Sequence, residues 1–260
     1  MFLHFCADMA QKWRLNKHSM IVKQKIKTKE AILLILIISL TIALVFISNA
    51  TNGMIVFNRL SESINKQIVY QLITIFVTTV FLMILFFHKK EEFQRYFRKG
   101  NISAEIIPQP IVGIKPNPKE NWSHLGRNFA IVISVITGIL VYFQLIKGSE
   151  VTFTDVLNVL PFSILFALSN SFVEEMITRF GVVVVLKNTI NDKIIPIISA
   201  LIFGTVHYWG NPGGFFGVIA AGFLAWLLAK SIIETKGVFW AWLIHFLQDV
   251  IIFSALLALS

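Results

Sequence analysis

Long apolar stretches alternate with shorter polar ones along most of the chain. A helix needs about 20 apolar residues to cross the hydrocarbon core of a bilayer, and seven stretches approach or exceed that length. The pattern therefore predicts an all-α fold, a multi-pass transmembrane helix bundle of about seven spans, within a range of six to eight. The stretches lie at about 31–48, 68–87, 129–146, 156–186, 194–208, 214–233 and 238–258.

Three of these stretches have features of their own. The fourth would form about 46 Å of helix at about 1.5 Å per residue, so we expect it to tilt, kink or project from the bilayer. The fifth is short for a span. The sixth carries a small residue at every fourth position, which lets helix backbones approach closely in lipid. Packing within the bundle explains this stripe better than self-association does, so we expect the sixth helix to lie inside the bundle. The stripe consists of Gly213, Gly217, Ala221, Ala225 and Ala229.

The composition agrees with a membrane protein. Hydrophobic residues make up 56% of the chain and charged residues 14%, whereas an ordinary soluble domain has about 25% charged residues. The net charge is +9, and attraction to anionic lipid headgroups explains it without nucleic acid. We therefore expect the lipid bilayer, and no nucleic acid, as a partner.

The basic residues are strongly biased to one side of the predicted bundle. If the seven stretches cross alternately, nineteen of the 23 Lys and Arg residues lie on the side of the N-terminus and three on the other side. Because cytoplasmic loops are enriched in Lys and Arg, we expect the N-terminus in the cytoplasm and the C-terminus outside. The nineteen are Lys12, Arg14, Lys17, Lys23, Lys25, Lys27, Lys29, Lys89, Lys90, Arg95, Arg98, Lys99, Lys115, Lys119, Arg127, Lys187, Lys193, Lys230 and Lys236, and the three are Arg59, Lys66 and Lys147.

The fourth apolar stretch contains three charged residues, Glu174, Glu175 and Arg179. A charged side chain near the centre of a bilayer costs about 2.5–3.5 kcal/mol on insertion scales, so ionisable groups there are candidates for a functional site. Glu175 and Arg179 are four residues apart and share a helix face, which favours an ion pair. Glu174 is turned about 100° away and is left free to act on something in the interior.

Two later stretches contain histidines with a partner one helical turn away. Phe203 and His207 share a face of the fifth stretch, and His245 and Asp249 share a face of the seventh. Measured along the helices, these groups and Glu174 lie on the order of 10–20 Å from the cytoplasmic side. Each group alone also has a structural interpretation: a buried ion pair, an interfacial histidine or a helix–helix hydrogen bond. Together they favour one shared site, which we expect to open toward the cytoplasmic half of the bilayer.

Three motifs in these stretches resemble those of the CPBP intramembrane proteases. That family includes the CAAX prenyl endopeptidases and the Abi-type bacteriocin-processing and self-immunity proteins. EExxxR is matched by residues 174–179, FxxxH by residues 203–207 and HxxxN/D by residues 245–249, in the family's order. The resemblance covers roughly residues 155–258.

The resemblance implies hydrolysis of a membrane-associated peptide or protein by an activated water. It implies that Glu174 is the general base, assisted by His207, and that His245 and Asp249 stabilise the oxyanion or orient the site. Glu175 and Arg179 would hold the geometry. The cofactor stays open: zinc bound by Glu174, His207 and His245 fits the usual three-ligand catalytic site, and a metal-free glutamate mechanism is the alternative.

Three positions depart from the family's usual residues. Thr178 stands where a bulky apolar residue is frequent, and Phe180 stands where glycine is frequent. Asp249 replaces the commoner asparagine, and an ionised aspartate cannot donate a hydrogen bond to an oxyanion. For Asp249 the sequence therefore leaves three roles open: a protonated donor, a metal ligand or a group that orients His245.

With this resemblance the chain divides into three segments. Residues 1–30 form a basic cytoplasmic N-terminal segment, and residues 31–150 form N-terminal transmembrane helices. Clustered prolines within 88–128 predict an extended cytoplasmic loop. We expect residues 151–260 to form the catalytic intramembrane protease core, in the plasma membrane of a bacterium. The alternatives are a transporter or proton- or cation-conducting protein, and a catalytically silent immunity or binding protein of the same fold.

Overall fold

The computed structural model describes residues 26–210 and 213–260. The predicted basic segment 1–30 therefore lies mostly outside the described residues. Within them the chain folds into helices and forms no strand. The helices are α2 (Thr28–Ala50), α3 (Glu62–His88), α4 (Lys90–Tyr96), η1 (Pro110–Val112), α5 (Trp122–Val141), η2 (Tyr142–Ile146), α6 (Phe153–Glu175), η3 (Met176–Phe180), α7 (Gly181–Leu186), α8 (Ile195–Val206), η4 (His207–Trp209), α9 (Gly214–Thr235) and α10 (Phe239–Ala258).

All seven apolar stretches contain helices, which confirms the predicted all-α multi-pass bundle. Six helices in the described part of the chain are long and apolar enough to cross a membrane: α2, α3, α5 with η2, α6 through α7, α9 and α10. The fifth stretch forms only the short apolar helix Ile195–Trp209. At about 1.5 Å per residue, this helix reaches only part of the way across a bilayer.

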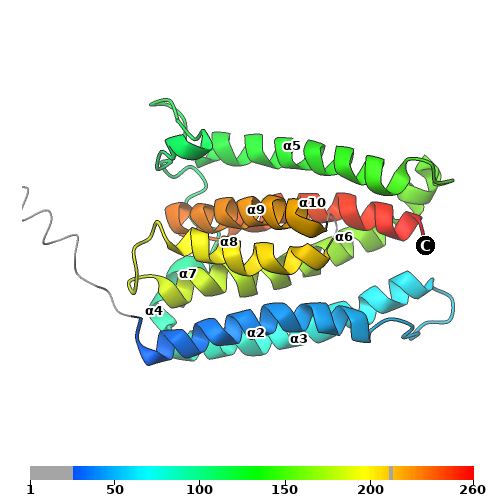
Figure 1. The fold of residues 1–260 in the computed structure, drawn as a ribbon, viewed down its shortest axis with the longest axis horizontal. Coiled ribbons are helices and arrows are strands. Elements are labelled where there is room, and N and C mark those ends of the chain that lie inside the picture. The colour runs from blue at the N-terminus through cyan, green and yellow to red at the C-terminus, as the bar shows by residue number, and fades with distance from the viewer. Residues whose placement is uncertain (1–25, 211–212) are drawn as a thin grey trace, which may run out of the picture.

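The helices run roughly side by side along one long axis (Figure 1). α2 and α3 form one edge of the bundle and α5 the other, with α6 to α10 between them. α10 packs against both α6 and α5, and α8 packs along α9. The core formed by the later helices is therefore covered on one side by α2 and α3, which precede it in sequence.

The sixth apolar stretch lies inside the bundle, as its small residues predicted. More than half of the apolar window of α9, 56%, is buried, against 11% for α5 at the edge. Gly217, Ala221, Ala225 and Ala229 of the stripe are all buried. They leave room for neighbouring helices to approach α9 closely.

The longest helix is interrupted where the charged residues lie. α6, η3 and α7 form one continuous segment, Phe153–Leu186, of 34 residues, or about 51 Å at 1.5 Å per residue. It begins at a capping box in which Thr152 accepts from the backbone of Asp155 and Asp155 accepts from that of Thr152. η3 is a π-helical turn directly after Glu175, and such turns are frequent at functional sites.

The predicted extended loop 88–128 is a packed cap over one end of the bundle. It contains α4 and η1, and its apolar side chains Tyr96, Ala104, Ile106 and Ile114 are buried. The prolines suggested an extended connector, but these side chains bury enough apolar surface to hold the loop against the helices. The expectation of an extended loop was therefore wrong.

Candidate active site

A buried ion pair forms at the π-helical turn between α6 and α7. Arg179 Nε lies 3.4 Å from Glu175 Oε1, and both side chains are fully buried. The Arg179 guanidinium also stacks over the Phe203 ring, with 3.5 Å from Cζ to the ring centroid. The predicted pair between Glu175 and Arg179 is thus present, and a cation–π contact from α8 supports it.

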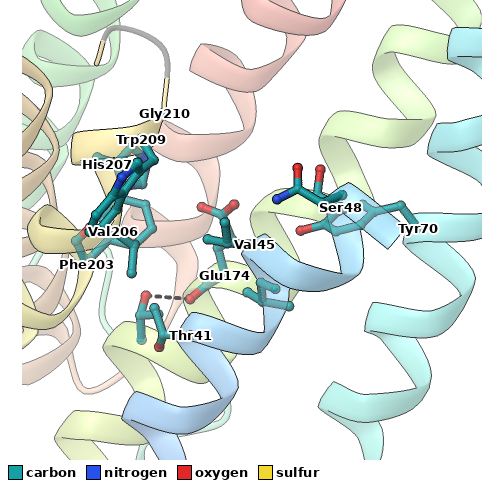
Figure 2. Close-up of a pocket in the computed structure, with 13 residues that line it drawn as sticks. Thr41, Val45, Ser48, Tyr70, Glu174, Phe203, Val206, His207, Trp209 and Gly210 are labelled. Atoms are coloured by element: carbon teal, nitrogen blue, oxygen red, sulfur yellow. Dashed lines mark hydrogen bonds between the residues drawn. The ribbon is translucent and has the colours of Figure 1, made fainter. Parts of the chain in front are cut away.

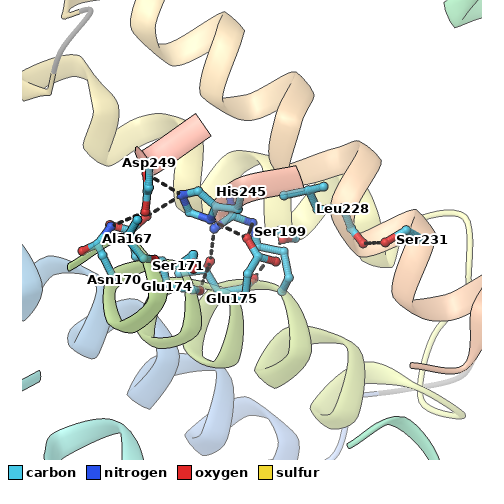
Figure 3. A network of polar contacts seen from close by, with 12 residues as sticks. Ala167, Asn170, Ser171, Glu174, Glu175, Ser199, Leu228, Ser231, His245 and Asp249 are labelled. Atoms are coloured by element: carbon cyan, nitrogen blue, oxygen red, sulfur yellow. Dashed lines mark hydrogen bonds and ion pairs between the residues drawn. The ribbon is translucent and has the colours of Figure 1, made fainter. Parts of the chain in front are cut away.

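His245 on α10 connects both glutamates. Its Nδ1 lies 2.7 Å from Glu175 Oε1, and because a carboxylate only accepts, Nδ1 donates in this contact. Its Nε2 lies 3.6 Å from Glu174 Oε2 and 3.5 Å from Asp249 Oδ1. The imidazole is therefore held in place by three carboxylates (Figure 3).

Asn170 joins the other side of this cluster. Its amide Nδ2 donates to Glu174 Oε1 at 3.2 Å and to Asp249 Oδ2 at 3.0 Å. Asn170 lies one helical turn before Glu174 on α6, so its side chain fixes the glutamate from the same helix. Asp249 accepts from Asn170 and lies beside His245, which favours the orienting role among the three that the sequence left open.

Thr178 explains why a small polar residue fits within the charged cluster. Its hydroxyl donates to the Glu174 carbonyl at 2.7 Å and accepts from Arg179 Nη1 at 2.7 Å. Its own carbonyl accepts from Ser199 of α8 at 2.8 Å. A bulky apolar residue at this position would leave the guanidinium without this partner.

His207 lies at the end of α8, where the helix tightens into the 3₁₀ turn η4. Its Nδ1 lies 2.9 Å from the carbonyl oxygen of Phe203, and because a carbonyl only accepts, Nδ1 donates in this contact. In a neutral imidazole the other nitrogen, Nε2, is then an acceptor. The ring packs on Phe203, with 4.2 Å between ring centroids, so Phe203 lies between His207 and the guanidinium of Arg179.

Glu174 and His207 face one cavity of about 250 Å³, called the site pocket below (Figure 2). The Glu174 side chain is 18% exposed, whereas that of Glu175 is fully buried. Residues of α2, α3, α6, η3, α8 and η4 form the walls, so helices from both ends of the sequence build the pocket. The lining residues are Thr41, Leu44, Val45, Ser48, Asn49, Tyr70, Glu174, Thr178, Phe203, Val206, His207, Trp209 and Gly210.

Tyr70 of α3 brings a hydroxyl group to the same cavity. Its hydroxyl points into the pocket toward the Glu174 carboxylate (Figure 2). Tyr70 is only 8% exposed, and its hydroxyl makes no hydrogen bond to another residue described in the structure. The pocket therefore offers a carboxylate, an imidazole and a phenol on its walls.

The proposed zinc ligands do not fit a metal site. No group of three His, Cys, Asp or Glu side chains among the described residues is arranged to hold a metal ion, and this includes Glu174, His207 and His245. In addition, both ring nitrogens of His245 already face carboxylates. These three residues therefore do not form a zinc site.

The six predicted site residues divide into a tight cluster and one outlying wall residue. Glu174, Glu175, Arg179, His245 and Asp249 are linked by contacts, whereas His207 joins them through Phe203 and the shared pocket. Asn170 and Tyr70 were not among the predicted site residues. Asn170 could have been predicted as a partner of Glu174, because it lies four residues before Glu174 and shares its helix face. Tyr70 is a single tyrosine in a span, and no spacing in the sequence links it to the site.

Comparison with known proteins identifies the segment that carries this cluster. Residues 155–251 match the family model described as type II CAAX prenyl endopeptidase Rce1-like. No curated protein and no solved structure matches the chain. The family match supports an intramembrane protease of the CAAX type in general. Over residues 155–251, the stretch that contains all three motifs, the chain is thus similar to the Rce1-like type II CAAX prenyl endopeptidases, which confirms the resemblance drawn from the sequence.

Proposed function

We propose that the chain is an intramembrane endopeptidase in which Glu174 activates a water molecule to hydrolyse a peptide bond. The observation that carries this proposal is the contrast between two adjacent glutamates. Glu175 is fully buried and paired with Arg179 and His245, whereas Glu174 is partly exposed in the site pocket. Asn170 holds the Glu174 carboxylate at the cavity, where it can accept a proton from a bound water, as a general base must.

The reaction needs one carboxylate and one water. Glu174 takes a proton from the water, and the water oxygen forms a bond with the carbon of the scissile carbonyl. The tetrahedral intermediate then collapses, the C–N bond breaks, and Glu174 returns the proton to the leaving nitrogen. The products are a new carboxyl terminus and a new amino terminus, and Glu174 is restored.

His207 and Tyr70 have complementary hydrogen-bonding capacity for this reaction. With Nδ1 bound to the Phe203 carbonyl, His207 Nε2 accepts, so it suits the second proton of the attacking water. The Tyr70 hydroxyl is a neutral donor, which an oxyanion requires. We therefore assign water orientation to His207 and oxyanion stabilisation to Tyr70.

The remaining polar residues position these groups. Asp249 and His245 fix Asn170 and the two glutamates, and Arg179 balances Glu175 inside the bundle. Their contacts join α6 and η3 to α10, so these helices keep Glu174 at a defined place in the pocket. We propose positioning roles for Glu175, Arg179, His245 and Asp249.

The position of the pocket inside a bundle of membrane-spanning helices supports a proposal for the substrate class. We propose a peptide or protein with a membrane-associated segment as the substrate, in the plasma membrane of a bacterium, with the N-terminus of the enzyme in the cytoplasm. Both a CAAX-like substrate and a bacteriocin-type precursor belong to this class.

The proposal is tested by incubating the purified protein, reconstituted in lipid vesicles, with a library of membrane-associated peptides. We expect mass spectrometry to find pairs of product peptides whose masses add up to the mass of a substrate peptide plus one water. We expect these pairs both with and without a chelator. Cleavage that is lost on chelation and restored by zinc would contradict the metal-free mechanism. Proton flux across the vesicles without cleavage would contradict the protease assignment and favour a conducting protein.

A further inference from the structure

The two ends of the bundle carry different charges. We call the end formed by the start of α2, loop 88–128 and the α7–α8 and α9–α10 turns the basic end. Of the 18 Lys and Arg residues that the structure describes, 14 belong to this end. Among the same residues the opposite end has Arg59, Lys66 and Lys147, and Arg179 lies inside the bundle. Because cytoplasmic loops are enriched in Lys and Arg, we place the basic end in the cytoplasm.

The basic end is closed by the packed loop. The Asn101 amide donates to the Thr235 carbonyl at 2.8 Å, and the Val238 amide donates to the Arg98 carbonyl at 2.9 Å. A Cβ atom on Gly100 would lie only 2.6 Å from the Thr235 oxygen, so the loop is in backbone contact with the α9–α10 turn. This contact covers the cytoplasmic approach to the helices that carry the site.

Side chains fasten the same loop to α9. Trp122 Nε1 donates to Glu234 at 2.8 Å, and the buried Lys230 pairs with Glu234 and donates to the Ile107 carbonyl at 2.7 Å. A separate cavity of about 260 Å³ at this end has Phe172 and Met176 among its lining residues, but none of the six predicted site residues. This cavity shares no lining residue with the site pocket.

The site pocket opens at the opposite end. Its inner wall includes the buried Thr178 and Phe203, whereas its outer wall includes the exposed Asn49, Trp209 and Gly210. Asn49 lies in the last turn of α2, and Trp209 ends the helix that begins at α8. The helix Ile195–Trp209 is shorter than the spanning helices beside it, and α8 ends before α5 and α10 do along the bundle axis (Figure 1).

We propose that the substrate reaches Glu174 from the non-cytoplasmic face of the membrane, an inference that rests on the proposed protease function. It replaces the expectation that the site opens toward the cytoplasmic half of the bilayer. That expectation came from depth along the helices alone, and the depth of Glu174 does not say which way the cavity opens. The packed cap at the basic end and the exposed pocket residues Asn49 and Trp209 at the other end point to this direction.

The pocket wall also narrows the chemistry of the substrate. Its lining includes neutral polar side chains, Thr41, Ser48 and Tyr70, among apolar ones. It has no Lys or Arg and one carboxylate, Glu174. The substrate class is therefore an uncharged segment of an exported or outward-facing membrane peptide, and not the cytoplasmic end of a chain.

Labelling of single cysteines from one side of the membrane tests this direction without any need for activity. Cys6, the only cysteine in the chain, is first replaced in C6A. Asn49→Cys then places a thiol at the opening of the pocket, and the matched control Lys119→Cys places one on the exposed part of loop 88–128. Both are treated with a membrane-impermeant maleimide in intact and in permeabilised bacterial cells.

We expect Asn49→Cys to be labelled in intact cells and Lys119→Cys only after permeabilisation. Labelling of Lys119→Cys in intact cells, with Asn49→Cys protected until permeabilisation, would overturn the proposal. A second arm compares cleavage by Asn49→Cys before and after attachment of a bulky maleimide. A fall of at least tenfold supports entry beside Asn49, and an unchanged rate overturns it. Because the labelling arm does not depend on cleavage, a failure of the protease assignment is distinguishable from a wrong direction of access.

Discussion

At the scale of single residues, the charged cluster separates structural from chemical roles in two adjacent glutamates. Glu175→Ala leaves Arg179 without its carboxylate and removes the Nδ1 partner of His245. Removing one partner of a buried ion pair costs about 3–5 kcal/mol because the other charge stays buried. We expect a loss of unfolding free energy of that size in detergent titrations. The double variant Glu175→Ala/Arg179→Met should recover part of it, and a single variant as stable as the wild type would contradict the pairing.

Removal of the Tyr70 hydroxyl tests whether this residue stabilises the oxyanion. Tyr70→Phe keeps the ring in the pocket wall and removes the only donor that the side chain has. Loss of one oxyanion donor costs about 10²–10³-fold in kcat, so we expect a fall of at least about 100-fold with an unchanged KM and melting temperature. Tyr142→Phe, at an exposed position near the end of the helix that begins as α5, is the control. Equal kcat values in the two variants would remove Tyr70 from the mechanism.

At the scale of elements, helix α8 depends on close contact with α9. A Cβ atom on Gly204 would lie 2.8 Å from the Val218 carbonyl oxygen of α9, so Gly204→Ala should push the two helices apart and displace His207. We expect a lower melting temperature and reduced cleavage. Gly138→Ala is the matched control because a Cβ atom there meets nothing within 4 Å, and alanine favours a helix over glycine by about 0.5–1 kcal/mol. Equal melting temperatures would show that the contact is not needed.

The elements were predictable from the sequence where apolar length alone decides the structure. The spans followed from that pattern, and the buried stripe of α9 and the pair of Glu175 with Arg179 followed from four-residue spacing along a helix. Loop 88–128 was not predictable, because its packing depends on α9 and α10, far along the chain. Tyr70 was missed for the same reason: no local spacing reveals that α3 contributes a wall of the pocket.

At the scale of the whole molecule, one end of the bundle is basic and capped, and the other is open. The N-terminal helices α2 and α3 lie outside the segment that matches the protease family, yet they supply Thr41, Ser48 and Tyr70 to the pocket. We infer that the matched segment provides the reacting groups and that the preceding helices form the path to them. We then expect proteins with the same motifs but different substrates to differ in the sequences of their N-terminal helices.

The central claim is that Glu174 activates the water, and substitution of its carboxylate by an amide tests it most directly. Glu174→Gln keeps the size of the side chain and an oxygen that accepts from Asn170. Glu62→Gln, at an exposed position in the first turn of α3, makes the same change away from the pocket. The measurement is the initial rate of peptide cleavage by both variants and the wild type in the same vesicles. General bases contribute about 10²–10⁴-fold to a rate, so we predict a loss of at least about 100-fold in Glu174→Gln, with an unchanged melting temperature, and wild-type cleavage in Glu62→Gln. A folded Glu174→Gln variant that cleaves at the wild-type rate would contradict the account.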